Sequence, residues 1–187
     1  MKQHYCFWKA ELPAETVNEI KKMCETLQKE DGVILNDTGD GFKEGGDIRK
    51  SKVAWVVDTQ VDELIWRYVT MANSLMFGFD INKDFAVQYT TYKGEDEGHY
   101  DWHQDMDFIN DKYSDRKLSV VIQLSDGSEY EGGDFLFEFN TDIHKVEGFR
   151  TKGSILVFPS FLKHKVEKVT NGTRNSLVSW VVGPNFR

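Results

Sequence analysis

The stretch Gly98-His99-Tyr100-Asp101-Trp102-His103-Gln104-Asp105 contains two histidines, each followed two positions later by an aspartate. Along an extended strand, residues two apart share a face, so a histidine and its aspartate can point at one metal ion. The pairs His99 with Asp101 and His103 with Asp105 compete for this role, and spacing alone does not choose between them. A polar strand exposed to solvent is the alternative for either pair.

A third candidate ligand lies far downstream of this stretch. An apolar run ends at Phe158-Pro159, a short turn follows, and His164 opens the next segment. Two histidines and one carboxylate, the first two separated by one residue and the third distant, are typical of sites that hold non-haem Fe(II) and leave positions open. Arg174 follows ten residues after His164. A planar guanidinium there suits bidentate binding of a carboxylate.

The segment that begins at Arg174 predicts one wall of a pocket. Even-numbered residues from Arg174 to Trp180 would share the inward face of a strand. This places a guanidinium and an indole on one face, with the small Ser176 between them. Ordinary core packing is the alternative for Trp180.

From residue 85 onward the chain predicts a series of short strands. Period-two patterns and short apolar runs occur at Phe85–Tyr92, Leu118–Leu124, Phe135–Phe139, Ser154–Phe158, Val166–Val169 and Leu177–Val182. Turn signals such as Asp126-Gly127-Ser128 and Glu131-Gly132-Gly133-Asp134 separate them. This spacing is typical of a sandwich or jelly roll.

The N-terminal part predicts helices. Apolar residues recur at helical spacing after Pro13 and stop before Gly32, and a second helix is expected from about Asp62 to about Phe77. The predicted fold is therefore mainly β (α+β), a jelly roll with two N-terminal helices packed on it. We expect one domain over residues 1–187, in which 1–84 form a helical and loop support region and 85–187 form the core with the site.

Between the two predicted helices, Gly32–Ser51 is rich in Gly, Asp and Lys and is expected to be a long loop, followed by a strand over Val53–Val57. A loop of this length in a compact domain is often functional, and here it is a candidate lid. Arg49 at its exit is a candidate for the substrate pocket, where it would meet an acidic group. A solvated surface arginine is the alternative.

Composition narrows the class of protein. The chain has 187 residues, a net charge of −8 and 40% hydrophobic residues, which indicates a globular protein that repels polyanions, so no nucleic-acid partner is expected. The N-terminus has no apolar core of a signal peptide and no segment approaches a membrane span, so no membrane association is expected. Cys6 and Cys24 form no CxxC pair and are expected to be buried, in a reduced cytoplasmic setting. Nothing in the sequence sets the oligomeric state.

Taken together, these motifs resemble the iron and 2-oxoglutarate-dependent dioxygenases of the prolyl 4-hydroxylase branch. The resemblance spans about residues 88 to 183 and follows the order of the family. Its elements are Tyr92 with a Gly-containing loop, Tyr100-Asp-Trp-His103-Gln-Asp105, Leu118-Ser119 through Leu124-Ser125, Tyr130-Glu-Gly132-Gly133-Asp134, Phe158-Pro159-Ser160, His164, and Arg174 with Trp180. The fold that the resemblance implies is the double-stranded β-helix.

The resemblance also implies a metal site. It makes His103, Asp105 and His164 the iron ligands, in preference to His99 and Asp101, because only the first pair lies in the phrase Tyr-x-x-His-x-Asp. The cofactors implied are Fe(II), 2-oxoglutarate as cosubstrate and O2, with ascorbate as a candidate reductant.

Further residues acquire roles by the same resemblance. Arg174 would bind the C5 carboxylate of 2-oxoglutarate, and Tyr92 would donate a hydrogen bond to the cosubstrate. Tyr100 would lie near the substrate entrance and Trp180 would form a wall beside the metal. The loop after Tyr92 is longer than the common pattern and acidic over residues 95–97.

The activity that the resemblance implies is hydroxylation of an unactivated C–H bond with release of succinate and CO2. A prolyl residue of a peptide or protein is the expected substrate. The alternatives are a hydroxylase of a free amino acid or another side chain, and a non-enzymatic cupin-like binding module. A zinc hydrolase has no need for Arg174, and a nucleic-acid demethylase is disfavoured by the acidity of the chain.

Overall fold

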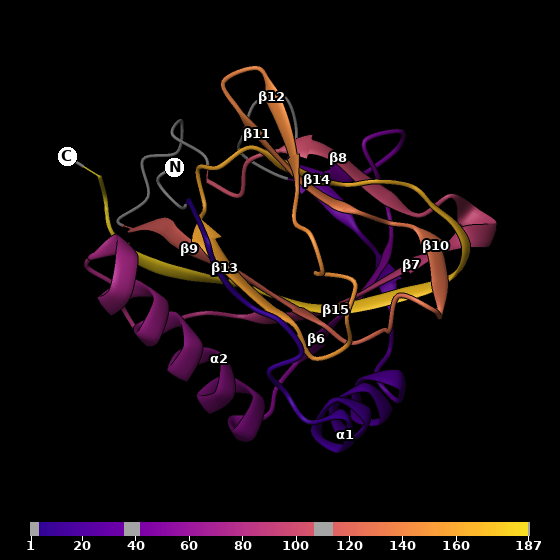
Figure 1. Cartoon of the computed structure of the whole chain (residues 1–187), viewed down its shortest axis with the longest axis horizontal. Helices are drawn as coiled ribbons and strands as arrows, with labels where there is room; N and C mark the ends of the chain where they lie inside the picture. The colour runs from indigo at the N-terminus through magenta and orange to yellow at the C-terminus, as the bar shows by residue number, and fades with distance from the viewer. Residues whose placement is uncertain (1–3, 36–41, 107–113, 187) are drawn as a thin grey trace.

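The computed structural model describes residues 4–35, 42–106 and 114–186. Two antiparallel sheets face each other and form a mainly β structure that agrees with the predicted jelly roll (Figure 1). The larger sheet runs in the order β1 (Cys6–Trp8), β13 (Ile155–Pro159), β9 (Ser114–Gln123), β15 (Val169–Pro184), β7 (Val87–Lys93), β6 (Lys52–Val56) and β2 (Glu30–Asp31), with β10 (Tyr130–Gly132) paired to β15. The smaller sheet runs in the order β12 (Asp142–Lys145), β11 (Phe135–Phe139), β14 (His164–Val166), β8 (His99–His103) and β5 (Arg49–Lys50).

Strand β9 shows why the larger sheet is the centre of the fold. It lies between β13 and β15, and all its residues from Lys117 to Gln123 are buried. Val120 and Ile122 belong to the core beneath the helices, whereas Val121 belongs to the core between the two sheets. Because successive residues of a strand point to opposite faces, one strand supplies both cores.

Two helices cover the outer face of the larger sheet. They are α1 (Ala14–Glu25), which follows Pro13, and α2 (Thr59–Ala72), and Figure 1 shows both on the side away from the smaller sheet. The carboxylate of Asp58 caps α2 by accepting hydrogen bonds from the backbone of the first turn, so this helix begins three residues earlier than the sequence pattern predicts. Its predicted C-terminal turn is a π-helical segment, Asn73–Phe77.

The segment predicted as one long loop has more structure than expected. Within Gly32–Ser51, β3 (Val33–Leu35) pairs with β4 (Phe42–Glu44), and β5 adds to the edge of the smaller sheet beside β8. Residues 36–41 lie outside the described residues. β5 has only two residues and is held by pairing with a distant strand, so no periodicity could reveal it.

Cys6 and Cys24 are both buried free thiols, which confirms the expectation from the sequence. Burial raises the pKa of the Cys6 thiol, and burial with the nearby Asp58 carboxylate raises the pKa of the Cys24 thiol to about 12. Within the ranges that the structure covers, none of the helices has the length and apolar character needed to cross a membrane.

Candidate metal centre

Three candidate ligands from two neighbouring strands meet at one point between the sheets. His103 ends β8, Asp105 follows it, and His164 begins β14 directly opposite His103. Their ligand atoms all lie within 4.8 Å of one another. The Nε2 atoms of His103 and His164 lie 3.7 and 3.5 Å from the two Asp105 carboxylate oxygens.

Backbone carbonyls orient both imidazole rings. His103 Nδ1 lies 2.7 Å from the Asp101 carbonyl oxygen, and His164 Nδ1 lies 2.8 Å from the Leu162 carbonyl oxygen. A ring that donates from Nδ1 to a carbonyl keeps the Nε2 lone pair for a metal, which is the usual arrangement of histidine ligands. Both histidines therefore aim a free Nε2 at Asp105.

The carboxylate is held as firmly as the rings. Asp105 Oδ2 accepts a hydrogen bond of 2.6 Å from the Ser119 hydroxyl, which in turn lies 2.9 Å from the Ser160 hydroxyl. The Asp105 backbone N–H donates to the Ser160 carbonyl at 2.9 Å, and Arg116 Nη1 donates to the Asp105 carbonyl at 3.2 Å. Neither Ser119 nor Arg116 was given a role from the sequence. The period-two pattern of β9 could have identified Ser119, because it lies two residues from Val121 and shares its inward face.

The protonation states match this donor set. Burial, reinforced by the neighbouring His164, lowers the pKa of His103 to about 3, so its imidazole is neutral at physiological pH. Burial alone would raise the pKa of Asp105, but His164, His103 and the Ser119 hydrogen bond outweigh it and hold that pKa below its usual range. A neutral imidazole and an ionised carboxylate are the forms that bind a metal.

A bulge in β8 separates the two candidate histidine pairs. On β14 the partners of Tyr100 and His103 are two residues apart, whereas Tyr100 and His103 are three apart, so β8 carries one extra residue there. His99 and Asp101 line a separate hollow on the outer face, while Tyr100 and His103 line the inner pocket. The two candidate pairs therefore lie on different faces, while His103 and Asp105 point at one site as their spacing allowed.

His99 is committed to the backbone. Its Nδ1 lies 2.7 Å from the Glu97 carbonyl oxygen and its Nε2 lies 2.8 Å from the Asp47 carbonyl oxygen. A backbone carbonyl faces each ring nitrogen, so neither nitrogen is open to a metal. In the described ranges, the cluster of His103, Asp105 and His164 is the one group of three or more metal-binding side chains.

The inner pocket contains polar atoms without partners. Arg174, Ser176, Val178 and Trp180 all line it, which confirms the predicted inward face of this strand. Arg174 is 1% exposed, yet among the described residues its Nη2 has no hydrogen-bond acceptor, and Ser176 Oγ and Trp180 Nε1 also lack partners. A buried unpaired guanidinium N–H is costly, so these donors fit a ligand that carries a carboxylate.

Two tyrosines and Arg49 complete the wall of the pocket. Burial raises the pKa of Tyr92, and burial raises the pKa of Tyr100 to about 12, so both phenols remain neutral donors. The Arg174 guanidinium lies 5.6 Å from the Tyr92 ring centre. Arg49 also lines the pocket and is 8% exposed, so the alternative of a solvated surface arginine is wrong.

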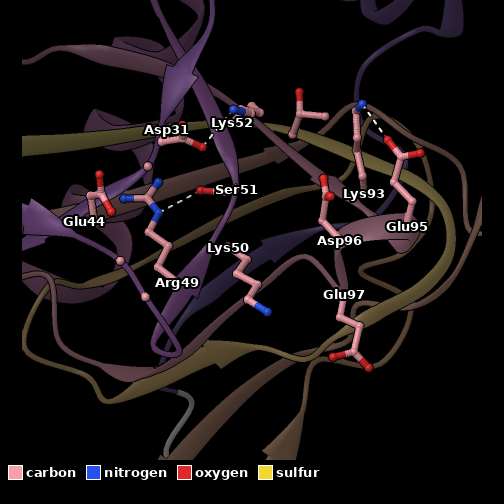
Figure 2. Close-up of a pocket in the computed structure, with 14 residues that line it drawn as sticks. Asp31, Glu44, Arg49, Lys50, Ser51, Lys52, Lys93, Glu95, Asp96 and Glu97 are labelled. Carbon is pink, nitrogen blue, oxygen red and sulfur yellow. Dashed lines mark hydrogen bonds and ion pairs between the residues drawn. The ribbon is translucent and has the colours of Figure 1, made fainter.

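A second, larger groove lies on the other side of Arg49. It has a volume of about 700 Å³ and is bordered by charged residues of the β2, β4, β5 and β6 region and of the turn after β7. Figure 2 shows Lys50 reaching into it opposite Asp96 and Glu97. Several of its charges are paired within the protein, as in the Lys93–Glu95 ion pair of 2.8 Å.

Two facing antiparallel sheets with a His–Asp–His centre between them define the class of non-haem iron oxygenases. Residues 87–182 match the 2OG-Fe(II) oxygenase superfamily, and the chain belongs to this family. The family uses Fe(II), 2-oxoglutarate and O2, and the three candidate ligands fit the metal.

Individual relatives agree with this assignment. A PKHD-type hydroxylase of Synechococcus sp. (strain CC9311) is 36% identical over 111 residues, which cover 57% of this chain and 49% of that protein. A PKHD-type hydroxylase of Prochlorococcus marinus (strain MIT 9301) is 29% identical over 179 residues, covering 91% of this chain and 74% of that protein. The chain thus spans about half of the Synechococcus protein and about three quarters of the Prochlorococcus one.

Among solved structures, a Pseudomonas putida prolyl-4-hydroxylase has a TM-score of 0.73 at 20% identity, covering 98% of this chain and 95% of that one. The viral collagen prolyl hydroxylase of Paramecium bursaria Chlorella virus-1 has a TM-score of 0.67 at 16% identity, covering 97% of both chains. These likenesses show a shared fold.

Proposed function

We propose that this chain is an Fe(II)- and 2-oxoglutarate-dependent hydroxylase that acts on a prolyl residue of a peptide or protein. One observation carries the proposal. The three-ligand cluster and the buried, unpaired guanidinium of Arg174 line the same pocket between the sheets. A cupin-like binding module or a zinc hydrolase would have no need for both.

In this proposal His103, Asp105 and His164 hold Fe(II). When bound, the metal supplies the activation of O2 that couples decarboxylation of 2-oxoglutarate to hydroxylation. The protein contributes ligand geometry: the Asp101 and Leu162 carbonyls fix the two rings, and the Ser119 hydroxyl fixes the carboxylate. Because these hydrogen bonds orient the ligands before the metal binds, less entropy is lost when the site is assembled.

Arg174 is proposed to bind the distal carboxylate of 2-oxoglutarate. Its free Nη2 and the unpaired Ser176 hydroxyl, two residues along β15, face the same pocket and could donate together. A guanidinium offers two parallel donors to a carboxylate, a geometry that lysine does not reproduce. Tyr92, which pairs with Arg174 across β7 and β15, is proposed as a further donor to the cosubstrate.

The proposed substrate rests on the likeness to prolyl hydroxylases. Besides the two structures above, a prolyl hydroxylase of Trichoplax adhaerens in complex with a hypoxia inducible factor peptide fragment has a TM-score of 0.73 at 15% identity. We propose that Tyr100 and Trp180 form the walls against which the substrate side chain packs, because both line the pocket beside the ligands. The Trp180 indole offers the flat apolar surface that suits a pyrrolidine ring.

The test is an anaerobic Fe(II) titration followed by exposure to O2 with 2-oxoglutarate, with succinate and peptide mass measured together. Proline-containing peptides, matched peptides with alanine in place of proline, and free amino acids are supplied in parallel. Succinate formed in step with a mass gain of about 16 Da on the proline peptide alone is the expected result, since one oxygen atom is inserted. A mass gain on a free amino acid would replace the proposed substrate. No succinate from folded, iron-loaded protein would favour a binding module.

A further inference from the structure

Tyr100 is held between a guanidinium and a candidate metal ligand. Its ring stacks on the His103 imidazole, with ring centres 3.5 Å apart and an angle of 10° between the planes. On the same phenol ring, the guanidinium carbon of Arg49 lies 4.7 Å from the centre. The three groups come from β5 and β8, which pair with Arg49 opposite Tyr100.

The stack on Tyr100 is a second contact that restrains the His103 ring. The hydrogen bond from Nδ1 to the Asp101 carbonyl orients the imidazole on one edge, and the stack on Tyr100 adds a second constraint, on its face. The Tyr100 ring covers one face of the imidazole, and His164 lies 4.2 Å away at an angle of 55°. If Tyr100 moved, the direction of the Nε2 lone pair would be less well defined.

Hydrogen bonds to the protein hold the Arg49 guanidinium in one orientation. Its Nε donates to Ser51 Oγ at 2.9 Å, its Nη1 to the Val33 carbonyl at 3.0 Å, and its Nη2 to Gln88 Oε1 at 2.8 Å. Three bonds from three nitrogens hold the planar guanidinium in one place, which lysine cannot reproduce.

Two glycines leave room for this arrangement. A Cβ atom at Gly32 would lie 2.3 Å from Ser51 Oγ and 2.7 Å from Arg49 Nε, and one at Gly45 would lie 2.3 Å from the Arg49 carbonyl oxygen. Any larger residue at either position would push against Arg49 or its partner Ser51.

We infer that Arg49 is a positioning residue of the metal centre: it holds Tyr100 against His103 and so sets the orientation of a metal ligand. Its role goes beyond the substrate contact expected from the sequence, because three of its N–H groups are already bonded to the protein. The inference rests on the proposed function only in treating His103 as a metal ligand.

The test compares Co(II) binding, followed by visible absorption, in the parent and in Arg49→Gln, Arg49→Lys and Lys50→Gln. Removing a positive charge near a cation site should tighten cation binding, so a charge effect and a positioning effect have opposite signs. We expect Arg49→Gln and Arg49→Lys to bind Co(II) about tenfold more weakly, with an altered absorption band, as for other residues that orient metal ligands. Lys50→Gln removes a positive charge from the next residue of β5, but this side chain is exposed and its charge is screened by solvent, so affinity and spectrum should stay unchanged.

A double-mutant cycle with Tyr100→Leu tests whether Arg49 acts through Tyr100. Adding Arg49→Gln to Tyr100→Leu should weaken Co(II) binding no further, because the link is already removed. If Arg49→Gln unfolds the protein, Gly32→Ala displaces the guanidinium without deleting it and should weaken binding in the same direction.

Two different outcomes would overturn the inference about Arg49 and the proposed metal site, respectively. Unchanged or tighter Co(II) binding in folded Arg49→Gln and Arg49→Lys would overturn the inference about Arg49. Unchanged Co(II) binding in His103→Ala would instead overturn the proposed metal site, whatever the Arg49 variants do. Neither readout depends on turnover.

Discussion

The two ends of β8 carry the same residue type in opposite chemical situations. At the His99 end, each ring nitrogen lies within 2.8 Å of a backbone carbonyl oxygen and the side chain serves the fold. At the His103 end, Nδ1 is bonded, but Nε2 faces the Asp105 carboxylate at 3.7 Å. The comparison indicates that the candidate site lies where polar atoms have no partner within the protein. Arg174, whose Nη2 has no acceptor among the described residues, is a second example on another wall of the pocket.

The largest effect should come from removing a ligand at the His103 end. Asp105→Ala and His164→Ala should each abolish Co(II) binding and reduce succinate formation by at least about a thousandfold, because two ligands cannot hold the metal in its working geometry. Isothermal titration with Co(II) and a succinate assay check this. His99→Ala, tested alongside, should retain metal binding. A dead His99→Ala with an active His103→Ala would reverse the comparison.

The next effect should come from the unpaired guanidinium. Arg174→Ala should raise the 2-oxoglutarate concentration needed for half-maximal succinate formation by about a hundredfold, since a charge-assisted bidentate contact is worth about 3 kcal/mol. Co(II) affinity should change little. A 2-oxoglutarate titration of the two proteins gives the ratio, and an unchanged requirement would remove Arg174 from the cosubstrate site.

A smaller effect is expected at the His99 end of β8. His99→Gln should lower the free energy of unfolding by about 0.5–1.5 kcal/mol, because the buried ring loses at least one hydrogen bond to the backbone, while Co(II) affinity stays within a few-fold of the parent. Urea denaturation measures the loss. Glu97→Gln is the matched control: it keeps the carbonyl that His99 uses and alters only the exposed carboxylate bonded to Lys168, so its effect on stability should be smaller than that of His99→Gln.

The mildest test uses pH on the metal-free protein. Burial lowers the pKa of His103 to about 3, whereas in the unfolded chain it is near 6.5. Between these values the unfolded state binds the extra proton, so this residue makes stability rise with pH, by at most about 1.4 kcal/mol per pH unit. Urea midpoints at about pH 4.5 and about pH 6.5 should differ less in His103→Gln than in the parent. If the two urea midpoints differed equally in His103→Gln and in the parent, the pKa of His103 would not be lowered in the folded protein.

The strands in which inward-facing and outward-facing residues alternate regularly were predictable from the sequence. The inward face from Arg174 to Trp180 and the buried strand β9 were expected from alternation, and the structure confirms both. The bulge in β8 was not predictable, because one extra residue leaves no mark on composition yet turns His103 to the inner face. Strand β5 and the contact of Arg116 with the Asp105 carbonyl depend on long-range packing, which a single sequence does not encode locally.

The burial of the two thiols has a consequence for their oxidation in the presence of iron and air. Oxidation of cysteine begins with the thiolate, and a pKa raised to about 12 at Cys24 keeps that form scarce. Exposure to ferrous iron in air should therefore leave both cysteines reduced for longer than an exposed thiol. A cysteine introduced at the exposed Ile48, next to Arg49, would then be labelled selectively by an alkylating fluorophore, giving an optical reporter of β5 while the centre binds its metal.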